Sequence, residues 1–128
     1  MALSTTLTSG GETTTEVSTI YTIKQGDAIY IPVTVTLDEE TVTSEDVALI
    51  DELEFMIGKC IRRVAKASEC WSDEAEAFLF ELRQADTLLR RPGIYPFDCR
   101  IKLASGEVIG MNNTEKIRIA DSMSREVI

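Results

Sequence analysis

The chain has 128 residues, of which 44% are hydrophobic, and this predicts one globular domain with a buried core. Its formal net charge of -9 disfavours binding to nucleic-acid phosphates. The sequence has no histidine and only three cysteines without CxxC spacing, which argues against a zinc site, a disulfide scaffold and the usual catalytic base.

The N-terminal segment from Met1 to about Glu16 is rich in Ser, Thr and Gly. This composition predicts a flexible N-terminal arm. The arm has few apolar residues, so we expect it to be disordered in the free monomer and ordered only against a neighbouring subunit. Leu3 and Leu7 are the candidate interface anchors of that contact.

Two strands are expected next. Val17 to Lys24 reads as the first, and Gln25-Gly26-Asp27 as the turn after it. From Ile29 to Leu37, large aliphatic residues occupy every second position, which predicts the second strand. Pro32 within this strand favours an edge strand or a bulge.

The segment 47–64 allows two interpretations. Leu53, Phe55 and Ile57 occupy alternate positions, which predicts a strand with a bulge at Gly58. A helix is the alternative, because several hydrophobic residues here also fall near a 3.6-residue period. The strand is favoured, because a glycine inside a helix costs about 1 kcal/mol.

The second half of the chain is dominated by strand patterns. Phe78, Phe80 and Leu82 mark one strand, and the longest alternation covers 95–103. The residues of that alternation expected to be buried on one face are Tyr95, Phe97, Cys99, Ile101 and Leu103. A hairpin turn at Ser105-Gly106 then leads to strands at 107–112 and 117–119.

About seven or eight short strands at close spacing predict an all-β fold, an antiparallel β-sandwich. We divide the chain into an N-terminal arm at residues 1–16 and a β-sandwich domain at residues 17–128. Cysteines packed as small hydrophobic residues fit a chain made in a reducing cytoplasm, although a Cys60–Cys70 disulfide is an alternative. No apolar run has the length of a membrane span, and the N-terminus lacks the pattern of a signal peptide.

Charged residues supply the candidates for chemistry. The acidic clusters are Asp38-Glu39-Glu40, Glu45-Asp46, and Asp73-Glu74 with Glu76. They lack the spacing of calcium loops, so solvated loops are favoured. A carboxylate pair drawn from Glu52, Glu54 and Glu81 is a weak candidate, since a working pair needs a pocket. We therefore expect no catalytic residue, no metal and no cofactor.

The remaining candidates are basic residues and the single tryptophan. Arg62-Arg63 with Lys66, and Arg90-Arg91, lack interleaved aromatic residues and are expected to pair with acidic loops. Trp71 lies in a polar loop. It is either a core residue or an exposed interface anchor.

Several short motifs together carry a resemblance. They are Gln25-Gly26-Asp27 before an aliphatic strand, Glu54-Phe55-Met56-Ile57-Gly58, Gln84-Ala85-Asp86-Thr87, Pro92-Gly93-Ile94-Tyr95 and Ser105-Gly106-Glu107-Val108. With these motifs, the chain from about Ile20 to Ile128 resembles small tailed-phage and prophage proteins that have an immunoglobulin-like sandwich. It is similar to the N-terminal domain of phage baseplate upper proteins.

This resemblance implies a structural, non-enzymatic virion protein that is made in the host bacterial cytoplasm. Its implied partners are copies of itself and other virion proteins, with no nucleic acid, membrane, small-molecule substrate or cofactor. Baseplate upper proteins continue into further domains, so neck, tail, baseplate and head decoration all remain open positions. A carbohydrate- or surface-binding sandwich module is the alternative, although aromatic residues are only 6% of the chain.

Overall fold

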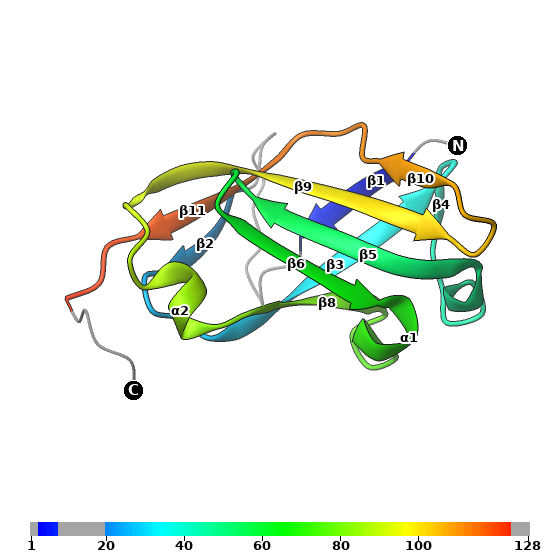
Figure 1. The fold of residues 1–128 in the computed structure, drawn as a ribbon, viewed down its shortest axis with the longest axis horizontal. Helices are drawn as coiled ribbons and strands as arrows, with labels where there is room; N and C mark the ends of the chain where they lie inside the picture. Colours follow the sequence, from blue (N-terminus) through cyan, green and yellow to red (C-terminus); the bar gives the residue numbers. More distant parts are fainter. Residues whose placement is uncertain (1–2, 8–19, 124–128) are drawn as a thin grey trace.

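The computed structural model describes residues 3–7 and 20–123, which form two β-sheets packed face to face (Figure 1). The first sheet has the order β1 (Leu3–Leu7), β3 (Ile29–Leu37), β8 (Ala77–Leu82) and β7 (Trp71–Ser72), with β4 (Glu40–Thr41) paired to β3. The second has the order β2 (Ile20–Lys24), β11 (Glu115–Ala120), β9 (Gly93–Leu103), β5 (Ile50–Ile57) and β6 (Ile61–Lys66), with β10 (Val108–Gly110) paired to β9. The predicted all-β sandwich is confirmed.

The expected strand count also holds in the described part of the chain. Eight strands there have five or more residues, and β4, β7 and β10 are shorter. The prediction of an antiparallel sheet needs one amendment, because β2 runs parallel to β11. Three short helices lie between strands: η1 (Val47–Leu49), α1 (Ala67–Cys70) and α2 (Gln84–Thr87).

Three phenylalanines form the centre of the core. Phe55 of β5 stacks on Phe80 of β8 with ring centroids 5.0 Å apart, so this pair joins the two sheets. Phe97 of β9 completes the group, 6.5 Å from Phe55 and 6.1 Å from Phe80. All three come from positions where the sequence alternates, because successive strand residues point to opposite faces of a sheet.

The alternation over β9 predicted its buried face. Phe97, Cys99, Ile101 and Leu103 are buried, as expected. Tyr95 is only partly buried, and its hydroxyl donates a hydrogen bond to the Arg91 carbonyl oxygen at 2.6 Å. The hydroxyl of a tyrosine needs a hydrogen-bond partner, so the ring lies at the edge of the core where the Arg91 carbonyl is within reach.

The segment 47–64 is a hairpin, which corrects one detail of the strand prediction. β5 and β6 pair antiparallel from Glu52↔Lys66 to Ile57↔Ile61, so the strand interpretation is right and the helix is wrong. The bulge at Gly58 is also wrong, because Gly58 begins the turn between two separate strands with φ of 58°. This left-handed conformation favours glycine, and a Cβ there would lie 3.2 Å from the Tyr95 ring.

Pro32 does not mark an edge strand or a bulge. β3 lies between β1 and β8, and Pro32 pairs with Leu79 of β8 in an unbroken register. On its other side, β1 covers only Val33–Leu37, so Pro32 lies just outside that pairing. A proline lacks a backbone N–H and is tolerated where only one neighbouring strand needs the ladder.

Residues 3–7 correct the prediction of a flexible arm, because they form β1 in the chain's own sheet. β1 pairs with β3 from Leu3↔Leu37 to Leu7↔Val33. Leu3, Thr5 and Leu7 are buried, with exposed fractions of 0%, 2% and 8%. The alternation of these three residues is a short period-two signal that the Ser/Thr-rich composition concealed. Residues 8–16 lie outside the described residues.

β1 also contacts the second sheet. Leu3 forms a parallel bridge with Met111, and its carbonyl oxygen accepts the Asn112 N–H at 2.7 Å. The Asn113 side chain then pairs with the Thr5 backbone twice: its Oδ1 accepts the Thr5 N–H at 3.0 Å and its Nδ2 donates to the Thr5 carbonyl at 2.8 Å. We name this contact between residues 3–7 and 111–115 the β1 seam.

Candidate functional site

A pocket around Trp71 is the best candidate site. It encloses about 440 Å³ and is lined by Thr41, Val42, Thr43, Ser44, Trp71, Asp73 and Glu76. One wall comes from the end of β4 and the loop after it, and the other from β7 and the turn that leads to β8. The pocket therefore joins two segments that lie about thirty positions apart in the sequence.

Trp71 is fixed by contacts at two edges of its ring. The indole packs edge-to-face on Phe78, with centroids 4.9 Å apart and an interplanar angle of 69°. Its Nε1 donates a hydrogen bond to Asp73 Oδ1 at 2.7 Å. The ring is half-buried: it packs against the core, as one of its two expected roles required, and its exposed part lines the pocket.

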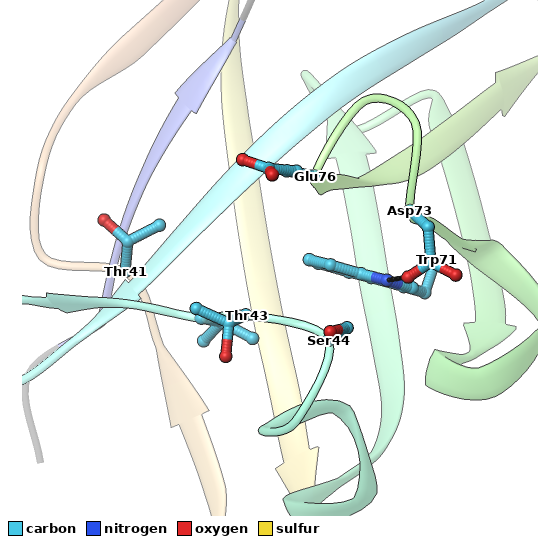
Figure 2. Close-up of a pocket in the computed structure, with 7 residues that line it drawn as sticks. Thr41, Thr43, Ser44, Trp71, Asp73 and Glu76 are labelled. Atoms are coloured by element: carbon cyan, nitrogen blue, oxygen red, sulfur yellow. Dashed lines mark hydrogen bonds between the residues drawn. The ribbon is translucent and has the colours of Figure 1, made fainter.

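The opposite wall is held in place by backbone contacts. The N–H of Val42 donates to the Val35 carbonyl at 2.8 Å, which continues the sheet into the loop. Asp46 Oδ2 accepts from both the N–H and the hydroxyl of Thr43, at 3.0 and 3.1 Å. These contacts fix the loop that faces Trp71. In Figure 2 the indole is seen edge-on, with Glu76 on one side and Thr43 and Ser44 on the other.

The pocket carries negative charge without a basic neighbour. Asp73 and Glu76 are its two ionisable lining residues, and no lysine or arginine is among the seven. Glu76 has φ of 51°, a left-handed conformation that costs a non-glycine residue of order 1 kcal/mol or more. Both residues belong to an acidic cluster for which the sequence favours a solvated loop. Their place beside Trp71 in the sequence was the available signal.

Glu54 is held by two arginines. Its Oε1 accepts a hydrogen bond from Arg100 Nε at 2.6 Å and its Oε2 one from Arg62 Nε at 2.5 Å. The hydrogen bond from Arg100, with a smaller contribution from Arg62, lowers the pKa of Glu54 below its usual value despite burial. Glu54 is thus ionised at neutral pH and cannot serve as a general acid.

Two further residues of the basic run form ion pairs. Arg63 pairs with Asp86 at 2.5 Å and Lys66 with Asp51 at 3.4 Å. With the Arg62–Glu54 pair, the basic run beginning at Arg62 has acidic partners, but they lie on β5 and α2 and not in the expected acidic loops. Arg90 instead donates to backbone carbonyls.

The cysteines are free thiols. Cys60 is exposed, whereas Cys70 and Cys99 are buried. Burial raises the pKa of Cys70 to about 11, and burial likewise raises the pKa of Cys99 well above the usual thiol range. Both buried thiols are therefore protonated and unreactive at neutral pH. Within the described residues, no group of three or more potential ligands could hold a metal ion.

The structure separates the three predicted interface residues. Leu3 and Leu7 are in the core of their own sandwich, on the β1 side, and as placed they are not available to a neighbour. Trp71 is at the other edge of that sheet and lines the pocket. The expectation for the two leucines is therefore wrong, because their alternate positions bury them against β3.

Comparisons with known proteins identify no family. No protein-family model matches the sequence, and no curated protein is significantly similar to it. Among solved structures, the fibronectin(III)-like modules of Clostridium thermocellum CbhA are similar over 91% of this chain and 94% of that chain, with 12% sequence identity and a TM-score of 0.46. This neighbour gives no support to the phage resemblance, which rests on the sequence motifs alone. No helix in the described part of the chain is long and apolar enough to cross a membrane.

Proposed function

We propose that this chain is a non-enzymatic structural component of a tailed-phage particle and that it acts through protein–protein assembly. The motifs that resemble the N-terminal domain of baseplate upper proteins support the phage origin. An exposed groove on the sandwich supports the assembly role. Copies of the chain and other virion proteins are the proposed partners, and the virion is the proposed location.

The groove is lined by residues of both sheets, including edge strand β6. It encloses about 340 Å³ and is lined in part by Tyr30, Arg63, Val64, Leu79 and Arg83. Tyr30 is 60% exposed and Val64 41% exposed, although both are large apolar side chains. Tyrosine and arginine around exposed apolar surface is the composition typical of protein interfaces. This groove is the observation that carries the proposal.

The assembly role is tested by the solution mass of the full chain. We expect light scattering to show concentration-dependent association, and the double variant Tyr30→Ser, Val64→Thr to shift the protein toward the monomer. Leu89→Ser is the matched control, because Leu89 is 83% exposed but lies outside the groove. Equal association of the double variant and the control would reject the groove as the interface.

The phage origin has a separate test. Tailed particles purified from a host that carries this gene should contain the chain in stoichiometric amounts, as measured by quantitative mass spectrometry. Purified particles that lack the chain would contradict the proposal.

A carbohydrate-binding module is the second candidate, and Trp71 is the observation that favours it. Tryptophan often supplies the apolar surface on which a sugar ring packs. Trp71 is, however, the single aromatic residue among those that line the pocket. Sugar platforms present several rings, so assembly is the better supported function.

A further inference from the structure

The Trp71 pocket combines an aromatic face with negative charge. One wall is the half-buried indole of Trp71, with Asp73 at the Nε1 edge of the ring and Glu76 over one side of it (Figure 2). Asp73 already accepts the indole N–H, so one of its oxygens remains for another donor. Glu76 forms no hydrogen bond or ion pair with any residue that the structure describes.

The neighbourhood of the pocket strengthens this charge. The turns and loops around it also contain Asp38, Glu39, Glu40, Glu45, Asp46 and Glu74, with no lysine or arginine between 38 and 46 or between 73 and 76. Negative potential in a cleft raises the local concentration of cations. The aromatic wall attracts cations as well, through the electron-rich face of the indole.

We propose that this pocket binds an arginine side chain of a partner protein. This proposal rests on the proposed function only for the identity of the partner protein, which would be a copy of this chain or another virion protein. A guanidinium group is flat, always charged and weakly hydrated, so it stacks on an indole and donates to carboxylates in the same plane. An ammonium group is compact and strongly hydrated and uses the aromatic wall less well. A cavity of about 440 Å³ has room for the guanidinium and the end of its aliphatic stem.

The carboxylates favour a cation over a neutral sugar. A sugar hydroxyl can donate to Asp73 or Glu76, but it leaves their charge uncompensated. An arginine supplies both the donors and the opposite charge. The other polar groups of the pocket, the hydroxyls of Thr41, Thr43 and Ser44, accept hydrogen bonds from either ligand.

The single tryptophan of the chain makes the pocket directly observable. Its fluorescence reports on this pocket and on no other place in the molecule. We expect N-acetyl-arginine amide to change the emission of the full chain in a saturable way. N-acetyl-citrulline amide, which has nearly the same shape without the charge, should cause no saturable change. Added salt should weaken the arginine response, because the contact is exposed.

Variants of the turn locate the binding. Glu76→Gln should weaken arginine binding by about threefold to tenfold, since an exposed charge-assisted contact is lost. Glu74→Gln is the matched control: it removes the same charge from the same turn, but Glu74 does not line the pocket. Circular dichroism melts of both variants should match the parent, since both side chains are exposed.

Three results would overturn the proposal. They are an equal response to arginine and citrulline, an equal loss in Glu76→Gln and Glu74→Gln, and a saturable response to glucose, galactose or mannose instead of arginine. A lysine amide that is acetylated on its α-nitrogen keeps its ammonium group. If it binds as tightly as the arginine compound, the preference for guanidinium is overturned. If the chain is abundant in particles but does not bind arginine, only the assignment of this pocket is contradicted. If the chain binds arginine but is absent from particles, only the proposed function is contradicted.

Discussion

Glu54 and Glu115 are two carboxylates of one sheet in opposite surroundings. Glu54 lies on β5 between two arginines, which lower its pKa. Glu115 lies in the β1 seam and forms no ion pair with the described residues. Its Oε2 accepts the Leu7 N–H at 3.1 Å, and its Oε1 lies 3.3 Å from Asn113 Nδ2. Burial outweighs these hydrogen bonds and raises the pKa of Glu115.

The contrast shows that similar groups contribute to the fold in different ways. The charge of Glu54 stabilises the outer face of the six-stranded sheet, because it neutralises Arg62 and Arg100. Burial of a charged Glu115 lowers the stability of the fold. The side chain contributes to stability through the hydrogen bonds that its oxygens accept from β1. The seam thus depends on packing and hydrogen bonds, while the outer face depends on ion pairs.

The packing of the seam gives the largest expected effect. Leu3 is fully buried, so Leu3→Ala should lower the free energy of unfolding by about 2–5 kcal/mol through the lost transfer energy and the cavity. Urea unfolding measures this change. Thr6→Ala on the same strand is the control, because Thr6 is exposed. A Leu3→Ala protein as stable as the control would mean that β1 does not belong to this core.

The hydrogen bonds of the seam come next. Asn113→Ala removes both partners of the Thr5 backbone, which should cost about 1–3 kcal/mol because Thr5 is buried. Asn112→Ala is the matched control, since Asn112 contributes only its backbone N–H to Leu3. Hydrogen exchange should show faster exchange of the Thr5 amide in the first variant alone. An unchanged exchange rate of the Thr5 amide would contradict the assignment of the Asn113 side chain as the hydrogen-bond partner of the Thr5 backbone.

The outer face should respond more weakly and depend on salt. Glu54→Gln leaves Arg62 and Arg100 without their anion and should cost about 1–2 kcal/mol, since both arginines are more than half exposed and partly screened. The cost should shrink at high ionic strength. Glu52→Gln, on the same face of the same strand, should have almost no effect. A salt-independent loss would contradict the assignment to ion pairing.

The pH dependence should be smallest and opposite in sign for the two carboxylates. The stabilisation from Glu54 is present above the ordinary glutamate pKa of 4.5 and is lost as the pH falls through its lower folded pKa. Glu115 keeps its proton to a higher pH in the folded state than in the unfolded chain. Its effect therefore reduces stability as the pH rises from 4.5 through its raised folded pKa.

Urea unfolding of the parent, Glu54→Gln and Glu115→Gln over this acidic range measures both terms. Relative to each variant, the parent should gain stability with pH in the Glu54 comparison and lose it in the Glu115 comparison. If the stability difference between the parent and the variant changes with pH in the same direction for Glu54 and Glu115, the two carboxylates do not differ as proposed.

Local patterns predicted much of the sandwich. The alternation in β3, β8 and β9 identified strands and their buried faces, because a period of two has one structural meaning. The pattern does not distinguish a bulge from a turn at Gly58 between β5 and β6, since a glycine with positive φ fits both. The alternation at Leu3, Thr5 and Leu7 is too short to predict a strand against the Ser/Thr/Gly-rich composition of the segment, which predicts a flexible arm.

The candidate site was less predictable, because it depends on contacts between distant segments. Trp71, Asp73 and Glu76 are neighbours in the sequence, but the wall formed by 41–44 is brought to them by the sheet. The two arginines that hold Glu54 come from β6 and β9. No local pattern carries the register that places them there.

The β1 seam also bears on the order of events during synthesis. Thr5 and its partner Asn113 are 108 positions apart, and Leu7 contacts Glu115 across a similar separation. β1 precedes the other described strands in the chain, so it must wait for the segment 111–115 before both of its edges are occupied. Contacts of such long range slow folding, because the loop must close before the contact forms. We expect the strands from β2 onward to assemble first and β1 to close the sandwich last.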